Sequence, residues 1–179
     1  NVEVKISIFE GEKVIIEKIN IAGNTVTNDS VIRGDLLVAE GDPFSELLVN
    51  KSINKIKGRN LFASVEKKSL PGSNSGLKIL EIQVEEKATG ELMAGAGIGT
   101  DGTSFSFSVS ENNWLGRGIN LQSNLNVSEE KINGNIAIIN PNYNFSGNAV
   151  STSFDVSSTD RTATTGFKSS RTGFDLGTS

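Results

Sequence analysis

Residues 103–127 read TSFSFSVSENNWLGRGINLQSNLNV and hold two alternating segments separated by a glycine-rich turn. Small polar residues, mostly Ser, Asn and Gln, alternate in these segments with Phe105, Phe107, Val109, Ile119, Leu121, Leu125 and Val127. Because successive strand side chains face opposite sides of a sheet, each segment predicts a strand with one apolar and one polar face. Such a sheet suits a membrane β-barrel. A half-exposed soluble sheet has the same period, and this stretch alone favours the soluble sheet.

The composition changes near residue 90. Residues 1–89 contain 12 Lys and Arg and 13 Asp and Glu, whereas residues 90–179 contain 5 and 8. Gly, Ser, Asn and Thr replace Lys and Glu after this point, which predicts a domain boundary at Lys87-Ala88-Thr89. The chain also begins within an alternating run, Val2 to Ile8, so we expect it to be an excised piece of a longer protein.

Several classes of function are disfavoured by composition. The chain has no Cys and no His, so thiolate and imidazole metal sites are excluded and an enzyme becomes a poor hypothesis. A net charge of −4 without a basic stripe gives no reason to expect nucleic-acid binding. No apolar run reaches 18 residues, so no transmembrane helix is expected.

The first half predicts a small α+β unit with the order β-α-α-β-β. Strands are expected at 14–21, 61–67 and 77–85. A helix capped by Thr27 or Asn28 is expected to reach Leu37, and a second helix is expected from Ser45 to about Arg59. We therefore divide the chain into a tail at 1–11, this unit at 12–88 and an all-β part at 89–179.

The second half shows no helical period. Alternation predicts six strands, at 91–99, 103–110, 119–127, 132–140, 150–156 and 167–176. The connections between them are alternately short and longer, as in an up-and-down antiparallel meander. Trp114 lies in the turn at 112–118, beside Asn and Gly residues, and this position favours the membrane–water boundary.

Three motifs that suggest chemistry have simpler explanations. Gly97, Gly99 and Gly102 match a dinucleotide-binding pattern, but a strand follows where that motif needs a helix. The pairs Glu85-Glu86 and Glu129-Glu130 cannot converge on one substrate from adjacent strand positions. The aspartates lack the spacing of a calcium loop. We expect no catalytic residue, no cofactor and no metal.

Several short motifs together resemble the BamA family of outer-membrane-protein insertases. They are Lys13–Asn24, residues 47–65 with their ending Gly58-Arg59-Asn60-Leu61-Phe62-Ala63-Ser64-Val65, Val84–Lys87, Gly95–Thr100, Asn113–Gly118 and Asn140-Pro141-Asn142-Tyr143. Each is weak alone, but their order and spacing are similar to those of the C-terminal POTRA domain and the first barrel strands. The resemblance implies that 1–11 is the tail of a preceding POTRA domain and that 89–179 is an incomplete transmembrane β-barrel.

The resemblance also implies a function at the outer membrane of Gram-negative bacteria. POTRA domains in the periplasm receive unfolded outer-membrane proteins, and the barrel inserts them without a nucleotide. The implied partners are these clients, accessory assembly lipoproteins and outer-membrane lipid, with no nucleic acid. Because the sheet is incomplete, we expect the fragment to associate with itself.

Three groups of residues are candidates for this function. The candidate lateral-gate strand, which would template a client strand by β-augmentation, is Glu91, Leu92, Met93, Ala94, Gly95, Ala96, Gly97, Ile98 and Gly99. The family turn motif is Asn113, Trp114, Leu115, Gly116 and Gly118. The candidate POTRA edge strands are represented by Val14, Ile16, Phe62 and Val65.

Two alternatives remain open at this stage. A two-partner-secretion transporter, which moves a soluble passenger through its pore, is compatible with the polar face of Ser, Asn and Gln. A soluble surface β-domain without a membrane role is also compatible with the alternation. The soluble domain requires a second sheet of the same chain to cover the apolar face of residues 103–127.

Overall fold

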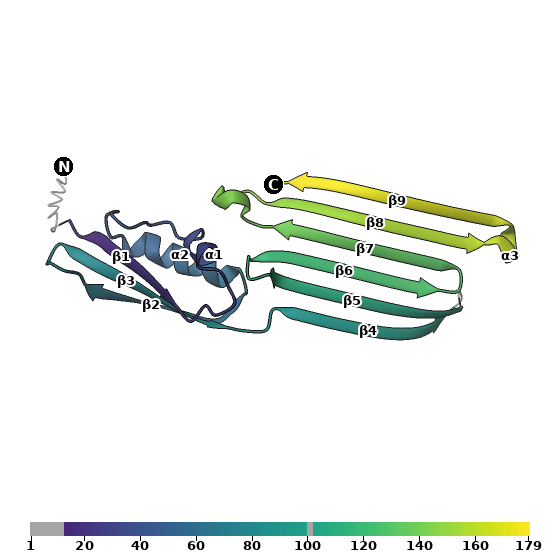
Figure 1. Cartoon of the computed structure of the whole chain (residues 1–179), viewed down its shortest axis with the longest axis horizontal. Helices are drawn as coiled ribbons and strands as arrows, with labels where there is room; N and C mark the ends of the chain where they lie inside the picture. The colour runs from purple at the N-terminus through teal and green to yellow at the C-terminus, as the bar shows by residue number, and fades with distance from the viewer. Residues whose placement is uncertain (1–12, 100–101) are drawn as a thin grey trace, which may run out of the picture.

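The computed structural model describes residues 13–99 and 102–179, so the expected tail at 1–11 and the turn residue Asp101 lie outside the described residues. Two parts follow one another along the long axis of the molecule (Figure 1). The first is a small α+β unit, residues 13–87, which we call the N-terminal unit. The second is a single six-stranded sheet, residues 90–178, which we call the C-terminal sheet.

The N-terminal unit has the expected order β-α-α-β-β. Its elements are β1 (Ile15–Ala22), α1 (Asp29–Arg33), α2 (Glu46–Gly58), β2 (Phe62–Pro71) and β3 (Leu77–Glu86). The sheet order is β1-β3-β2, with β1 parallel and β2 antiparallel to the central β3. Both helices lie on one face of this sheet (Figure 1). The α+β prediction for this region is confirmed.

Helix α2 forms where its capping signals and its apolar stripe agree. The Ser45 hydroxyl accepts a hydrogen bond from the Leu48 amide, and Glu46 lies in the first turn. Val49, Ile53 and Ile56 recur at helical spacing and are buried against the sheet. Truncating Ile53 or Ile56 to Ala would cost about 2–5 kcal/mol of stability.

Helix α1 is shorter than the sequence predicts. It ends at Arg33 instead of Leu37, and neither predicted cap closes its start, because Asn28 makes no side-chain capping bond and Thr27 contacts another part of the chain. The chain leaves the helix at Gly34 so that Asp35 can enter a buried ion-pair cluster. Leu37, expected in the apolar stripe, is 46% exposed, and its amide donates to the buried Ser52 hydroxyl. Tertiary contacts therefore override the local helical pattern.

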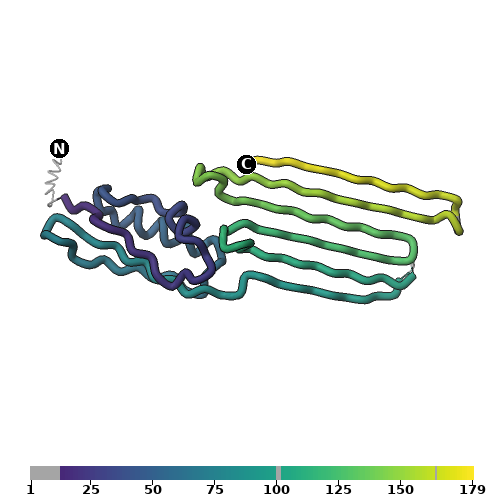
Figure 2. Tube along the Cα trace, in the orientation of Figure 1, coloured from purple at the N-terminus to yellow at the C-terminus, as the bar shows by residue number. Residues whose placement is uncertain are grey.

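The C-terminal sheet contains six antiparallel strands in sequence order. They are β4 (Gly90–Gly99), β5 (Gly102–Trp114), β6 (Ile119–Ser128), β7 (Lys131–Asn140), β8 (Val150–Arg161) and β9 (Phe167–Thr178). A short 3-10 turn, η1 (Tyr143–Phe145), joins β7 to β8, and a four-residue helix, α3 (Thr162–Thr165), joins β8 to β9. The trace returns toward the N-terminal unit at the β5–β6 and β7–β8 turns (Figure 2). The predicted meander is confirmed.

The pairing register places most of the apolar side chains of the six strands on one face, with Met93, Ile139 and Phe167 as exceptions on the other. Phe107 is opposite Ala94 and Leu125, Leu121 is opposite Ile138, and Phe154 is opposite both Ile136 and Phe174. The opposite face carries small polar groups that pair across strands. Examples are Ser108 with Asn124 at 2.8 Å and Ser157 with Asn133 at 2.7 Å. The strands are 10 to 13 residues long, sufficient for tilted strands to cross a hydrocarbon layer.

The hydrophobic core lies entirely in the N-terminal unit. Within residues 13–99 and 102–179, every buried apolar side chain falls between Ile16 and Val84. Large side chains on the apolar face of the C-terminal sheet stay open, with Ile98 90% and Phe107 49% exposed. No second sheet of the described chain covers them, as a soluble surface β-domain would require. Among the described residues, no helix combines the length and the apolarity needed to cross a membrane.

The two faces of β6 provide a direct test of membrane placement. Leu125 lies near the middle of β6 on the apolar face, and its neighbour Asn124 lies on the polar face. In the intact protein in lipid bilayers, we expect Leu125→Arg to lower the free energy of unfolding by about 2–4 kcal/mol, because it places a charge in hydrocarbon. Asn124→Arg, the matched control, should cost about 1 kcal/mol, the value of one lost hydrogen bond. Equal costs in a denaturant titration would contradict lipid contact by the apolar face.

Candidate functional site at the junction of the two sheets

The two parts of the chain meet at the β5–β6 and β7–β8 turns. Both turns lie at the end of the C-terminal sheet that faces the N-terminal unit (Figure 1). They contact the segment from Val26 to Asp35, which contains α1. The contacts are mostly hydrogen bonds between buried polar groups, and these groups define the candidate site.

The first turn is tied to the N-terminal unit by Asn113, which is 7% exposed. Its Nδ2 donates to the Thr27 hydroxyl at 2.8 Å, and its Oδ1 accepts from the Gly118 amide at 2.8 Å. Beside it, the Asn28 amide donates to the Gly116 carbonyl at 2.8 Å. One side chain therefore closes its own turn and holds the neighbouring unit.

The second turn repeats this arrangement with Asn142, which is 8% exposed. Its Oδ1 accepts from the Gly147 amide at 2.9 Å, five residues later, as Asn113 does with Gly118. Its Nδ2 donates to the Gly34 carbonyl at 3.2 Å and to Asp35 Oδ1 at 3.3 Å. Two asparagines in equivalent positions thus connect adjacent hairpins to one segment.

The glycines of the first turn permit this close approach. Gly116 has a φ of +68°, and a Cβ built there would lie 2.1 Å from the Val26 carbonyl oxygen. Gly118 has a φ of +62°, and its Cβ would lie 2.9 Å from Val31 Cγ1. Both positions combine a left-handed backbone with contact to the N-terminal unit, so only glycine fits without displacement.

Asp35 anchors the segment that Asn142 contacts. Its side chain is 1% exposed and accepts from Arg59 Nε at 2.6 Å and Nη2 at 3.1 Å. Lys55 Nζ lies 3.3 Å from Asp35 Oδ1. A buried carboxylate is costly unless it is paired and hydrogen-bonded, and here two cations and one amide satisfy it. The cluster joins α1, α2 and the C-terminal sheet through one residue.

Glu86, the last residue of β3, holds the loop that precedes α1. Its carboxylate accepts from the amides of Thr25, Val26 and Thr27 at 2.6 to 3.2 Å and from the Thr25 hydroxyl at 2.6 Å. Partial burial raises the pKa of Glu86, but the hydrogen bonds from Thr25, Thr27 and Val26 outweigh it and lower the pKa to about 2. The loop therefore stays fixed where Asn113 and Gly116 meet it.

The sequence-predicted residues occupy three separate places. Residues 91–99 form β4, an edge of the C-terminal sheet, and every one of them is exposed. Asn113, Gly116 and Gly118 lie in the junction, whereas Leu115 is 71% exposed. Trp114 is 42% exposed and ends β5, so it lies in the strand and not in the turn as expected. The reason is a register shift between Glu111 and Trp114, which lets pairing continue to Ile119.

The candidate POTRA edge residues differ in whether the strand edge beside them is available to pair with another strand. Phe62 and Val65 are buried in the core, but β2, which carries them, is an edge strand. Val14 precedes β1, and its carbonyl accepts from the Phe44 amide at 2.8 Å. Ile16 donates to Asp42 and accepts from Gly41, so the first half of the β1 edge is already paired with the chain's own loop.

Sequence reasoning missed Asp35 and the roles of Thr27, Glu86 and Asn142 at the junction. One available signal was the spacing Asn-x-x-x-x-Gly, which occurs at Asn113–Gly118 and again at Asn142–Gly147. Asp35 and Glu86 carry no comparable signal, because their partners are distant in sequence. Among the described residues, no group of three acidic side chains is placed to hold a metal ion.

Comparisons with known proteins agree with this architecture. The model of the POTRA family, described as a surface antigen variable number repeat, matches residues 14–87. The outer membrane protein assembly factor BamA of Neorickettsia risticii is 37% identical over 118 residues, and BamA of Neisseria meningitidis serogroup B is 28% identical over 157 residues. These alignments cover 64% and 87% of this chain but only 16% and 19% of the relatives.

A solved structure shares the fold of nearly the whole chain. The crystal structure of BamA from Haemophilus ducreyi lacking POTRA domains 1–3 superposes with a TM-score of 0.76 at 23% identity. The match covers 93% of this chain and 32% of that one. It therefore includes the N-terminal unit and the strands that follow it in one arrangement.

The contact between Asn142 and Asp35 can be tested with a charge. Asn142→Asp keeps the acceptor for Gly147 but places a second carboxylate beside Asp35, so we expect the junction to weaken by about 1–3 kcal/mol. Spin labels at Lys57 and Ser170 should then show a broadened distance distribution by pulsed electron paramagnetic resonance. Asn148→Asp, on another exposed residue of the same β7–β8 connection, is the control and should keep the wild-type distribution. The interpretation fails if both variants broaden it equally.

The Glu86 cluster predicts a dependence of stability on pH. Because the folded pKa lies below the ordinary value of 4.5, the carboxylate stabilises the fold above about pH 4.5, and this contribution is lost as the pH falls toward 2. We expect Glu86→Gln to be less stable than wild type at neutral pH, with the difference shrinking across that window in thermal melts. Thr25→Ala, which removes one hydrogen-bond donor to Glu86, should narrow the pH range across which this stability is lost. A difference that is constant with pH would refute the assignment.

Proposed function

Because this chain belongs to the BamA family of outer membrane protein assembly factors, we propose that it joins the domain that receives clients to the strand that inserts them. The protein is located in the outer membrane, with its POTRA domain, the N-terminal unit, in the periplasm. Its clients are unfolded outer-membrane proteins. Insertion proceeds through backbone hydrogen bonding and needs no catalytic side chain, nucleotide or metal.

The observation that supports this proposal most directly is the state of β4. Within the described residues β4 pairs only with β5, so one row of its amide and carbonyl groups has no strand partner. The row is ten residues long, comparable to the hydrocarbon layer. A strand edge of this length is a template for another strand.

The side chains of β4 suit a pairing that forms and opens repeatedly. Between Ala94 and Gly97 the strand carries only Ala and Gly, which add little packing energy to a neighbouring strand. Backbone bonds therefore dominate, and the register is weakly specified. Such an edge accepts client strands of different sequence and releases them without losing large side-chain contacts.

In the periplasm, the β2 edge of the POTRA domain is the surface that we propose for extended client or accessory lipoprotein segments. The β1 edge is less suitable, because Ile16 and Val14 already bond to the loop at 41–44. The Ile19 amide and carbonyl are also taken, by Glu40 and Arg33. The β2 strand lies at the opposite edge of the same sheet.

The junction fixes the POTRA domain relative to β4. Only three residues separate β3 from β4, and the last of them, Thr89, bonds to Glu111 at 2.5 Å and accepts from the Asn112 amide at 3.2 Å. Together with Asn113 and Asn142, these bonds hold the β2 edge at a set distance from the template strand. A client bound at one edge is thereby presented to the other.

Cysteine cross-linking in the intact protein tests the proposal. We expect cysteines at Ala94 and Ala96 to form disulfides with cysteines placed along the terminal strand of a barrel client during its assembly. Antiparallel or parallel pairing predicts adducts at every second client position, because opposed strand residues share a face. The yield should be read by non-reducing gel electrophoresis.

Ile136→Cys is the matched control, because it lies on the apolar face, as Ala94 and Ala96 do, but on β7, which is paired on both sides. It should give no adduct. Cross-links at Ile136 that equal those at Ala94, or adducts at every client position without a period of two, would overturn templating by β4.

A further inference from the structure

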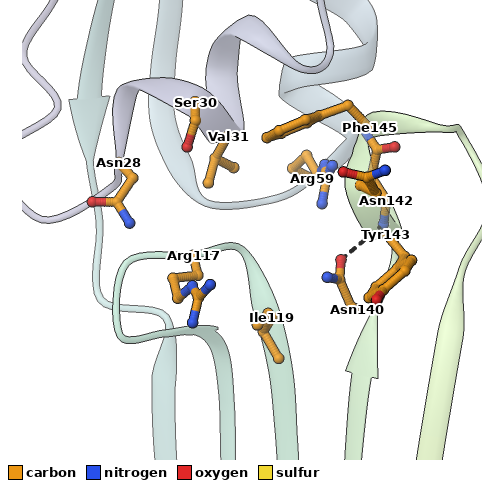
Figure 3. A pocket seen from close by; sticks show the side chains of 11 residues that line it. Asn28, Ser30, Val31, Arg59, Arg117, Ile119, Asn140, Asn142, Tyr143 and Phe145 are labelled. Carbon is orange, nitrogen blue, oxygen red and sulfur yellow. Dashed lines mark hydrogen bonds between the residues drawn. The ribbon is translucent and has the colours of Figure 1, made fainter.

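A cavity of about 470 Å³ lies between the POTRA domain and the C-terminal sheet. Asn28, Ser30 and Val31 line it from the segment around α1, and Arg117 and Ile119 line it from the β5–β6 turn (Figure 3). Arg59, Asn140, Asn142 and the residues of η1 complete the lining. The proposed insertion of clients does not use this cavity.

The position of the cavity follows from strand alternation. Leu121 and Ile138 are opposite one another on the apolar face, so Ile119 and Asn140, two residues nearer the POTRA domain on each strand, lie on the same face. The cavity therefore lies at the end of the apolar face nearest the POTRA domain, where the hydrocarbon layer of a membrane borders the lipid headgroups. Tyr143 and Phe145, which also line it, are 56% and 57% exposed, as aromatic residues at a membrane interface are.

The polar lining of the cavity is cationic and rich in donors. Arg117 has no ion pair and no side-chain hydrogen bond within the part of the chain that the structure describes. Arg59 uses Nε and Nη2 for Asp35 but not Nη1. No Asp or Glu lines the cavity.

Two amide side chains in the lining keep their donors available. The Asn140 Oδ1 accepts from the Asn142 amide at 3.1 Å, as Figure 3 shows, and among the described residues its Nδ2 donates to no partner. Asn28 does not cap α1 with its side chain. A cation and neutral donors around one space match a phosphate group, which offers several acceptor oxygens and a negative charge.

We propose that this cavity binds the headgroup phosphate of an anionic phospholipid in the membrane leaflet that faces the POTRA domain. Arg117 pairs with the phosphate, Asn28 and Asn140, which lie on opposite sides of the space (Figure 3), donate to other oxygens of the headgroup, and the acyl chains lie along the apolar face above Ile119. The bound lipid fills the space between the two parts and supports their fixed orientation. The proposal rests on membrane placement of the sheet and is independent of client insertion.

Native mass spectrometry of the intact protein in a phosphate-free detergent tests this site with phosphatidylglycerol as the probe. We expect Arg117→Gln to weaken binding of the first lipid about fivefold, which corresponds to about 1 kcal/mol for one arginine near an anionic lipid. Arg171→Gln, the control, removes an equal charge from the polar face of β9 and should leave the affinity unchanged. Asn140→Asp keeps the acceptor for Asn142 but adds a negative charge, and should weaken binding similarly.

Two comparisons identify the ligand, and each variant is first checked for wild-type strand content by circular dichroism. Phosphatidylcholine should bind more weakly than phosphatidylglycerol, and an excess of soluble glycerophosphate should not displace the lipid. Equal affinity of wild type, Arg117→Gln and Asn140→Asp would overturn the site. Displacement by glycerophosphate would show a general phosphate site and overturn the lipid assignment. Client cross-linking at Ala94 is a separate readout, so failure of one proposal does not imply failure of the other.

Discussion

The period of two residues in a paired strand is the constraint on which the C-terminal sheet depends. Once Phe107 is opposite Leu125, every other residue of β6, and of β5 as far as Glu111, is committed to a face, and the same holds through β9. A slip of one residue would bring Ser and Asn to the hydrocarbon side. The Ser108–Asn124 and Ser157–Asn133 bonds on the polar face favour the observed register over its neighbours.

The junction relies on a different kind of interaction, because it buries polar groups and little apolar area. Asn113, Asn142 and Asp35 are nearly inaccessible, and each is satisfied by partners from both sides of the junction or from its own turn. A change in geometry would break these hydrogen bonds and lower the stability of the junction, since an unpaired buried polar atom is costly. This makes the orientation of the POTRA domain specific, where an apolar contact would tolerate sliding.

Most of the architecture could be predicted from local patterns, because strand alternation and helical spacing depend on residues that lie close together in the chain. The alternation after residue 90 predicted six strands, and the Ser45 cap with the stripe at Val49, Ile53 and Ile56 predicted α2. The candidate site was predicted only in part. Asn113, Gly116 and Gly118 were singled out as a motif, but their contacts with Thr27, Val26 and Val31 required the neighbouring domain.

The sequence by itself therefore determined the elements, the two faces of the C-terminal sheet and the family resemblance, because these depend on residues near one another in the chain. Only the tertiary structure decided that α1 stops at Arg33, that Glu86 holds the loop at 25–27 and that Asn142 meets Asp35. Glu86 and Thr27 are 59 residues apart in the sequence, and Asn142 and Asp35 are 107 residues apart. No local period encodes contacts over such distances. Folding brings them together through the packing of α1 and α2 on the sheet and the return of the two hairpins to the POTRA domain.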